Sequence, residues 1–319
     1  MNLKYLDAGE IERLLPIADC IDVMESAFSA FGRGDIVQPL RTVVHRPDGA
    51  GSLYVMPSFN SHPAALAVKL ISVFHGNRAR GVPSHQGIVV AFDAASGTPA
   101  AILDAASLTA IRTAAVSALA TRLLARSDAD DLTLLGSGTQ AWSHLEAMRV
   151  VRPIRRVRVW SPNVERRRTF AEKAAAMHDI PVVATDSPKA AVERAHIVCT
   201  LTSSATPVLH GDWLARGTHI NAVGASTPNA RELDTNAVLR SRVVVDSLRA
   251  ALSESGDLLI PIREGAMDEG SIAAELADLV LGSAPARRGA DQITLFKSLG
   301  LAMEDAAAAA AVIERAALA

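Results

Sequence analysis

The stretch LTLLGSGTQAWSHLEAM, residues 132–148, constrains the fold of this chain most strongly. It begins as an apolar strand, turns through glycines and continues into a helix. Gly136, Gly138 and Ala141 match G-x-G-x-x-A, the dinucleotide-binding fingerprint, in the strand-turn-helix context that this fingerprint requires. An ordinary strand-to-helix turn that merely uses glycine is the alternative. The context favours a dinucleotide site.

Each small residue of the fingerprint has a physical task. Gly136 permits the tight turn, Gly138 lets the backbone approach a pyrophosphate, and Ala141 allows the helix to pack closely on the sheet. The free N–H groups at the N-terminus of the helix then face the phosphates.

Strand-like and helix-length segments alternate from Leu132 onward. The predicted strands are 132–135, 156–160, 181–184, 196–200, 218–223 and 243–246. This alternation predicts an α/β fold with a Rossmann-type, doubly wound parallel sheet over residues 123–293. Residues 294–318 read as one long alanine-rich helix.

The opening part of the chain has a different pattern. A helix is predicted over residues 8–32, followed by two strands within 41–55 that are joined by PDGAG, and by further strands in AALAVKLISVF and QGIVVAFDAASGTPAAIL. SLTAIRTAAVSALATRLLA then returns to helical spacing. Residues 1–122 are therefore expected to form a sheet-rich domain for substrate binding and dimerisation, completed by a C-terminal helix at 294–319.

Composition limits the partners. The 319 residues carry 32 Lys and Arg against 34 Asp and Glu, a net charge of −2, so no global field attracts nucleic acid or an acidic membrane. Cys20 and Cys199 lie far apart, which suggests neither a disulfide framework nor a metal site. No apolar run reaches the roughly 18 residues of a membrane span, so a cytoplasmic protein is expected. Because the net charge is close to zero, a small molecule is the expected partner.

The end of the second predicted Rossmann strand, VRVWSPNVERRR, bears on the choice between NAD and NADP. An acidic residue at Ser161 would bind the ribose diol of NAD, but Ser161 is not acidic and Arg166, Arg167 and Arg168 follow it. NADPH is therefore the expected cofactor, with NADH as the second choice. In the alternative interpretation, the arginines form a solvated helix face with Ser161 as N-cap and Pro162 at the first helical position.

Three basic residues stand in unusual places in the opening domain. Lys69 interrupts an apolar strand, Arg112 interrupts a helical segment of small apolar residues, and Arg41 begins the strand RTVV. Such residues either form structural ion pairs or face a ligand cleft, where a guanidinium can bind a carboxylate with two hydrogen bonds.

Longer motifs carry a resemblance to a known family. KLISVFHGN, GVPSHQGIVVAFDAASGTPAAILDAASLTAIRTAAVSALAT, LGSGTQAWSH, HINAVGASTPNARELD and TLFKSLGLAMEDAAAA resemble the ornithine cyclodeaminase and mu-crystallin family over nearly the whole chain. The resemblance is closest on the ketimine-reductase side. It implies a homodimer that is joined through the sheet of the opening domain.

The resemblance also implies site residues. The substrate carboxylate and the reacting carbon would be held by Arg41, Lys69 and Arg112, with Met56 and His85 lining the same pocket. The positions that would contact the dinucleotide are Thr113, Ser137, Gly138, Thr139, Gln140, Ser161, Thr202, Val223 and Gly224. The fingerprint itself adds Gly136, and the basic turn after Ser161 adds Arg166.

One departure from the family pattern decides between activities. Ornithine cyclodeaminases carry a catalytic aspartate where this chain has Ser226, and serine cannot act as the carboxylate base of deamination. A reductase needs no such base, because the C=N carbon of an iminium already accepts hydride. The resemblance therefore favours reduction of cyclic α-imino acids, Δ1-pyrroline-2-carboxylate and Δ1-piperideine-2-carboxylate, to L-proline and L-pipecolate.

Other functions stay open. His85 is a candidate for the residue that supplies or stabilises the imine proton, although SHQG also reads as a hydrogen-bonded turn. The alternative enzymes are an ornithine cyclodeaminase and an alanine-type amino-acid dehydrogenase. A non-catalytic protein that binds NADPH and a small ligand is the alternative of another class.

Overall fold

The computed structural model describes residues 3–318, except for the side chains of residues 75 and 78. The chain forms two compact units. One comprises Met1–Ala115 and Gly300–Ala319, and the other comprises Val116–Leu299. The division falls within helix α3, Ala105–Leu124, whereas the sequence placed a boundary after residue 122.

The first unit is built on one mixed sheet with the order β1-β7-β6-β5-β4-β2, and β3 pairs with β4. All its pairs are antiparallel except that between β1 and β7. Its strands are β1 Lys4–Leu6, β2 Ile36–Val37, β3 Thr42–His45, β4 Ser52–Asn60, β5 Ala65–Val73, β6 His85–Phe92 and β7 Pro99–Asp104. The predicted sheet-rich opening region, including the hairpin within 41–55, is thus confirmed.

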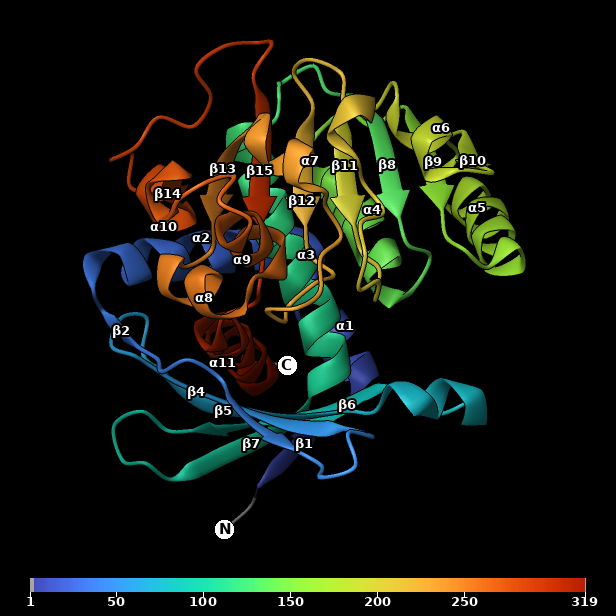
Figure 1. Cartoon of the computed structure of the whole chain (residues 1–319). Helices are drawn as coiled ribbons and strands as arrows, with labels where there is room; N and C mark the ends of the chain where they lie inside the picture. Colours follow the sequence, from blue (N-terminus) through green and yellow to red (C-terminus); the bar gives the residue numbers. More distant parts are fainter. Residues whose placement is uncertain (1–2, 319) are drawn as a thin grey trace. The chain divides into compact units, whose positions relative to one another are not determined.

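Helix α11, Ala302–Leu318, lies against β4 and β5 of this sheet (Figure 1). Burial alternates along β5, and Ala65, Ala67, Lys69 and Ile71 occupy its buried face. Since alternate residues of a strand share one face, Lys69 belongs to the core-facing set. Its ammonium group therefore needs a partner inside the unit.

The predicted single helix over 8–32 is wrong in one respect. The chain forms α1, Ala8–Leu14, and α2, Ile17–Arg33, with Pro16 between them as the N-cap of α2. Proline has no backbone N–H and its ring clashes with the preceding turn, so it ends one helix and begins the next. The first unit also contains the short 3-10 helix η1, His75–Arg80.

The second unit contains an eight-stranded parallel sheet with the order β10-β9-β8-β11-β12-β15-β13-β14. Its strands are β8 Asp131–Leu135, β9 Arg156–Trp160, β10 Val182–Ala184, β11 Ile197–Thr200, β12 His219–Ala222, β13 Ser241–Val245, β14 Ile272–Glu275 and β15 Ile293–Lys297. The six predicted strands are all present, and the doubly wound parallel sheet is confirmed. Strand order reverses beside β8, which is where such sheets bind ligands.

Helices connect these strands (Figure 1). They are α4 Thr139–Val151, α5 Val164–His178, α6 Pro188–Val192, α7 Thr235–Leu239, α8 Leu248–Glu254, α9 Gly256–Arg263 and α10 Leu276–Val280, with the 3-10 helices η2 Gly211–Trp213 and η3 Glu269–Ser271. Most helices begin with a side-chain cap, as Asp234 does for α7 by accepting from the Ala237 N–H.

The predicted helix over 294–318 is wrong in its first part. Residues Ile293–Lys297 form β15, which lies between β12 and β13 and is buried throughout. A strand that is covered on both faces shows no alternation of polar and apolar residues, so a continuous apolar run is easily assigned to a neighbouring helix. Gly300, at φ +79°, separates this strand from α11.

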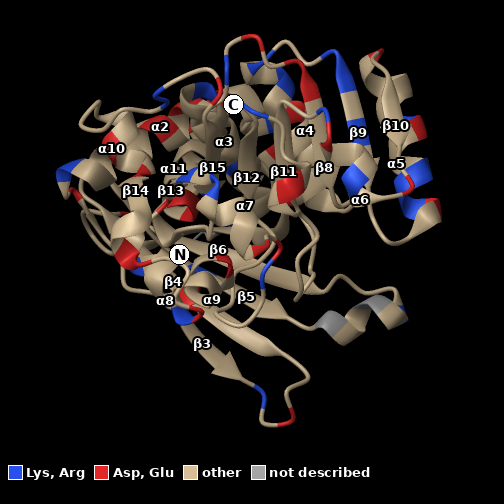
Figure 2. Cartoon of the chain, turned by 45° about the horizontal axis from the view of Figure 1, so that its top comes forward, with Lys and Arg blue, Asp and Glu red and all other residues tan. Residues whose placement is uncertain are grey.

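Charged residues of both signs are interspersed over each unit (Figure 2). Within residues 3–318, no helix has the length and apolar character that a membrane crossing requires. The described side chains also bring together no group of three or more His, Cys, Asp or Glu that could hold a metal ion.

Candidate active site

The fingerprint turn follows β8 and has the geometry that glycine alone permits. Gly136 has φ +128°, and a Cβ there would lie 2.6 Å from the Leu201 carbonyl oxygen. Gly138 is the N-cap of α4, so no side chain caps this helix. A Cβ at Gly138 would meet no other atom within 4 Å. Gly138 therefore leaves open space beside the backbone, as the close approach of a pyrophosphate would require.

The first turn of α4 fits a phosphate group. The N–H groups of a helix start attract anions, and this start carries no acidic side chain. Ala141 is fully buried against the sheet, as the fingerprint requires. The side-chain oxygen of Gln140 is buried without a hydrogen-bond partner in the described chain, so a bound molecule would satisfy it.

The ends of β8 and β9 bring two predicted residues together. The hydroxyls of Ser137 and Ser161 are 2.9 Å apart, and Ser161 also donates to the carbonyl of Asn163 at 3.2 Å. Asn163, not Ser161, caps α5 by accepting from the Arg166 N–H at 2.9 Å. The interpretation in which Ser161 caps a solvated arginine helix therefore placed the start of this helix two residues too early.

The three arginines that follow Ser161 differ in role. Arg167 is 7% exposed and donates to the Ser161 carbonyl at 3.0 Å and to Asp186 at 2.9 Å, so its function is structural. Arg166 and Arg168 are exposed. Helix α5 carries both basic and acidic residues (Figure 2).

A buried carboxylate, which sequence reasoning missed, joins the loops after β11 and β12. Glu232 accepts from the N–H and hydroxyl of Thr202, both at 2.6 Å, from the Gly224 N–H at 2.7 Å and from the Thr200 hydroxyl at 2.7 Å. Val223 donates its N–H to the Thr200 carbonyl at 3.1 Å. These donors are used inside the chain, so Thr202, Val223 and Gly224 would contact a dinucleotide mainly through other atoms.

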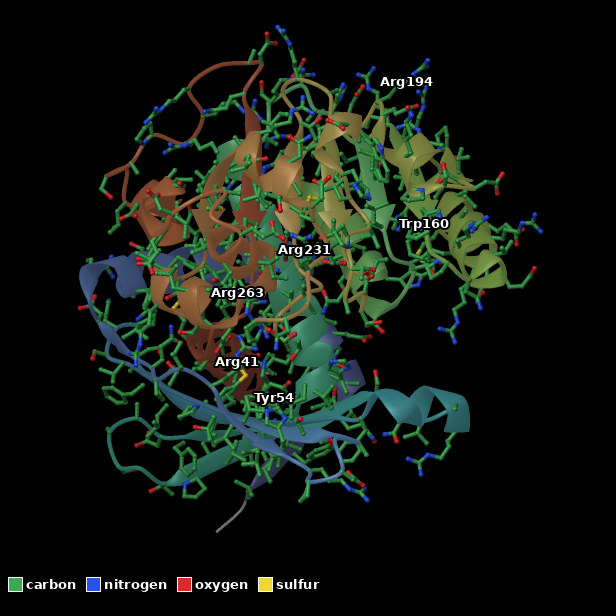
Figure 3. The ribbon with its side chains drawn as sticks, viewed as in Figure 1. Arg41, Tyr54, Trp160, Arg194, Arg231 and Arg263 are labelled. Atoms are coloured by element: carbon green, nitrogen blue, oxygen red, sulfur yellow. The ribbon has the colours of Figure 1, made fainter. Side chains whose placement is uncertain are left out.

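The predicted cations of the first unit form a buried cluster with two acids of α11. Lys69 Nζ lies 2.6 Å from Asp305 Oδ2, while Arg112 lies 3.0 Å from Asp305 Oδ1 and 2.6 Å from Glu304 Oε2. Arg41 donates to the carbonyl of Gly300 at 3.0 Å. Figure 3 labels Arg41 beside α11 at the face of the sheet.

Packing around this cluster is tight. Met56 is paired directly with Lys69 across β4 and β5 and is buried. A Cβ on Gly300 would lie 2.5 Å from a terminal nitrogen of Arg112, so only glycine leaves room for the guanidinium. Thr113 is buried beside Arg112 on α3.

Two of the cations share one carboxylate. Lys69 and Arg112 both contact Asp305, and Arg112 also contacts Glu304. Burial, and then the charge of Arg112, lowers the pKa of Lys69 to about 8, although Asp305 opposes this. Lys69 and Arg112 thus form the ion pairs of one interpretation, and their role in binding the carboxylate of a ligand stays a prediction.

His85 stands apart from this cluster within the unit. It begins β6 opposite Val73 and is exposed, with its Nδ1 3.0 Å from the hydroxyl of Ser84. Lys69 is paired with Val89, four residues further along β6, which corresponds to about 13 Å. The role of His85 stays a prediction.

Comparisons with known proteins agree with this geometry. A model of the ornithine cyclodeaminase/mu-crystallin family matches residues 3–318. The chain is 40% identical to a ketimine reductase mu-crystallin from Mus musculus over 314 residues, which cover 97% of this chain and 96% of that protein.

Solved structures of dinucleotide-dependent enzymes have the same fold. The structure of Δ1-pyrroline-2-carboxylate reductase from Thermococcus litoralis, in complex with NADH and L-proline, is similar with a TM-score of 0.97 and 38% identity, and covers 99% of this chain and 98% of that one. An archaeal alanine dehydrogenase dimer with bound NAD has a TM-score of 0.93 at 28% identity, covering 100% and 97%.

Proposed function

The chain belongs to the ornithine cyclodeaminase/mu-crystallin family, and from this premise we propose that it is an NAD(P)H-dependent reductase of cyclic α-imino acids. Its substrates are Δ1-pyrroline-2-carboxylate and Δ1-piperideine-2-carboxylate, and its products are L-proline and L-pipecolate. The ketimine reductase and the reductase complex with NADH and L-proline support this proposal.

The observation that carries the proposal is the buried cluster around Lys69 and Arg112. Lys69 and Arg112 contact the same carboxylate, Asp305, so the two cations lie close enough together to bind one substrate carboxylate. Lys69 and Arg112 hold that carboxylate and so fix the position of the neighbouring carbon. Arg41 adds positive charge on the same side, and Met56 supplies apolar contact.

A bound nicotinamide cofactor supplies the hydride in this reaction. The chain's own task is to orient the substrate and to keep its ring nitrogen protonated, for which His85 is the proposed residue. Ser226 stands where a cyclodeaminase has its catalytic aspartate, so no carboxylate base is available at that position. This absence favours reduction over deamination.

NADPH is the proposed cofactor, with NADH as the second choice. Ser161, at the end of β9, offers no carboxylate to a ribose diol and no negative charge that would repel a 2′-phosphate. Arg166 lies in the first turn of α5 and is exposed, so its guanidinium is available to a phosphate.

We further propose a cytoplasmic homodimer. The alanine dehydrogenase relative is a dimer, and family resemblance suggests the sheet of the first unit as the contact. Both cysteines are free and buried, which fits a reducing compartment.

One substrate panel tests the activity. NADPH and NADH oxidation is followed with the five- and six-membered cyclic imino acids and with pyruvate plus ammonia, and ammonia release is followed with ornithine plus NAD. The cyclic imino acids should be reduced fastest. Ammonia release from ornithine at a comparable rate would establish a cyclodeaminase instead, and tight dinucleotide binding without turnover of any substrate would establish a binding protein.

A further inference from the structure

Three buried charged side chains form a hydrogen-bonded network near the ends of β11, β12 and β15. Glu232, Asp257 and Lys297 are all fully buried. Asp257 accepts from the N–H groups of Glu232 and Leu233 at 2.8 and 3.0 Å, and from Lys297 Nζ at 2.8 Å. Lys297 also donates to the carbonyl of Ala225 at 2.5 Å, so the network holds the segment that follows β12.

Sheet topology relates this network to the dinucleotide site. Because the ribose next to adenine is read at the end of β9 and the pyrophosphate at the turn after β8, a bound dinucleotide would extend along the order β9-β8-β11-β12. Its nicotinamide half would then lie toward the ends of β11 and β12. Those ends carry Thr202 and Gly224, the two residues whose N–H groups Glu232 binds.

The network carries one net negative charge when Glu232 is ionised. Glu232 and Asp257 are two carboxylates, and Lys297 is their one ammonium partner. Each oxygen of Glu232 accepts one backbone N–H and one hydroxyl, which fits the four acceptor sites of an ionised carboxylate. Burial and then Asp257 raise the pKa of Glu232, and the hydroxyls of Thr202 and Thr200 and the charge of Lys297 oppose that rise.

We propose that Glu232 is a positioning residue that fixes the loops at the nicotinamide end of the site and whose charge favours the oxidised ring. This inference rests on the proposed function. A nicotinamide ring is neutral when reduced and cationic after it has lost hydride, so a buried negative charge nearby binds the oxidised form more strongly. The same charge therefore assists hydride donation to the imine carbon.

The test compares affinities for NADP+ and NADPH in Glu232→Gln and in a matched control. Asp131→Asn is the control, because it also converts a buried carboxylate into an amide in this unit. Asp131, however, pairs with Arg158 at the opposite, amino end of β8. Dissociation constants are measured by calorimetric titration without imino acid, and thermal unfolding is recorded in parallel.

Glu232→Gln should weaken the binding of both NADP+ and NADPH. It should also raise the ratio of the NADP+ to the NADPH dissociation constant on the order of tenfold. Asp131→Asn should lower the melting temperature and leave this ratio at the wild-type value. An unchanged ratio in Glu232→Gln would overturn the proposal, as would an equal change in the control.

A milder variant keeps the test decisive if Glu232→Gln does not fold. Thr200→Val removes one donor to Glu232 from a position that is fully buried and so touches no ligand. The same ratio should rise by a smaller factor, and no rise would overturn the proposal. A wild-type protein that binds both dinucleotides but reduces no cyclic imine would refute the proposed function separately, because these titrations need no turnover.

Discussion

The carboxylate of Asp305 lies 2.6 Å from the ammonium group of Lys69, and both side chains are almost completely buried. The same carboxylate contacts Arg112 at 3.0 Å. Helix α11 thereby supplies the counter-charge for two cations on β5 and α3. This arrangement allows a strand and a helix of the first unit to carry positive charge in an apolar interior.

Asp305→Asn should destabilise the protein by about 3–5 kcal/mol, because it leaves Lys69 and Arg112 with less negative charge in a buried site. Asp19→Asn is the matched control. Asp19 pairs with Arg315 at 2.7 Å, also between α11 and another helix, but both side chains are more than one third exposed. Its loss should cost less than about 1 kcal/mol. Similar losses in urea unfolding would show that the buried cluster contributes no more than a surface pair.

Arg112→Lys should lower kcat/KM for a cyclic imino acid on the order of 100-fold, because lysine keeps the charge but cannot hold a carboxylate in the same geometry. Lysine is preferable to alanine here, since alanine would leave Glu304 and Asp305 without this partner. Steady-state kinetics on folded protein measures the effect.

Ser226→Ala should retain most of the reductase activity, because a serine that transfers no proton contributes little to the barrier. A Ser226→Ala enzyme as slow as Arg112→Lys, with dinucleotide binding intact, would place the serine in the proton path and contradict the proposed mechanism.

The pH dependence of kcat/KM should report Lys69, whose pKa is about 8. The protonated form binds the substrate carboxylate, and its fraction falls as pH rises through this pKa, so kcat/KM should fall above about pH 8. Lys69→Arg keeps its proton at these pH values, so this part of the fall should disappear. Titration of the substrate imine lowers the rate in both enzymes, and identical profiles would therefore exclude Lys69 as the group observed.

Arg166→Ala should weaken NADPH binding by about 1–3 kcal/mol more than NADH binding, through lost charge-assisted hydrogen bonds to the 2′-phosphate. Arg168→Ala is the control, because it removes the same exposed charge two residues further along α5. Arg167 is unsuitable, since it holds the Ser161 carbonyl. Equal losses of NADPH and NADH affinity in Arg166→Ala would show that this arginine does not select the cofactor.

Local signals predicted much of the second unit. The fingerprint places Gly136, Gly138 and Ala141 within six consecutive residues, and the turn that they form depends on their own backbone. Likewise, the six predicted parallel strands were mostly separated by helix-length segments. Strand β15 was missed because a fully buried apolar run does not show the period of a strand.

Partners from distant parts of the chain were not predictable in this way. Lys69 and Arg112 are conspicuous as cations in apolar segments, but nothing in their surroundings indicates Asp305 as the partner. Glu232 lies in a loop among polar residues and gives no sign of its burial. Such contacts depend on how elements pack, which spacing along one segment does not specify.

Transfer of deuterium from NADPH labelled at both C4 positions of the nicotinamide ring tests the central claim most directly. After reaction with Δ1-pyrroline-2-carboxylate, NMR and mass spectrometry of the amino acid should locate one deuterium at the α-carbon of L-proline, because hydride passes from the cofactor to the imine carbon. L-Proline without deuterium at that carbon, or oxidation of the cofactor without formation of proline, would contradict the assignment of this chain as an imine reductase.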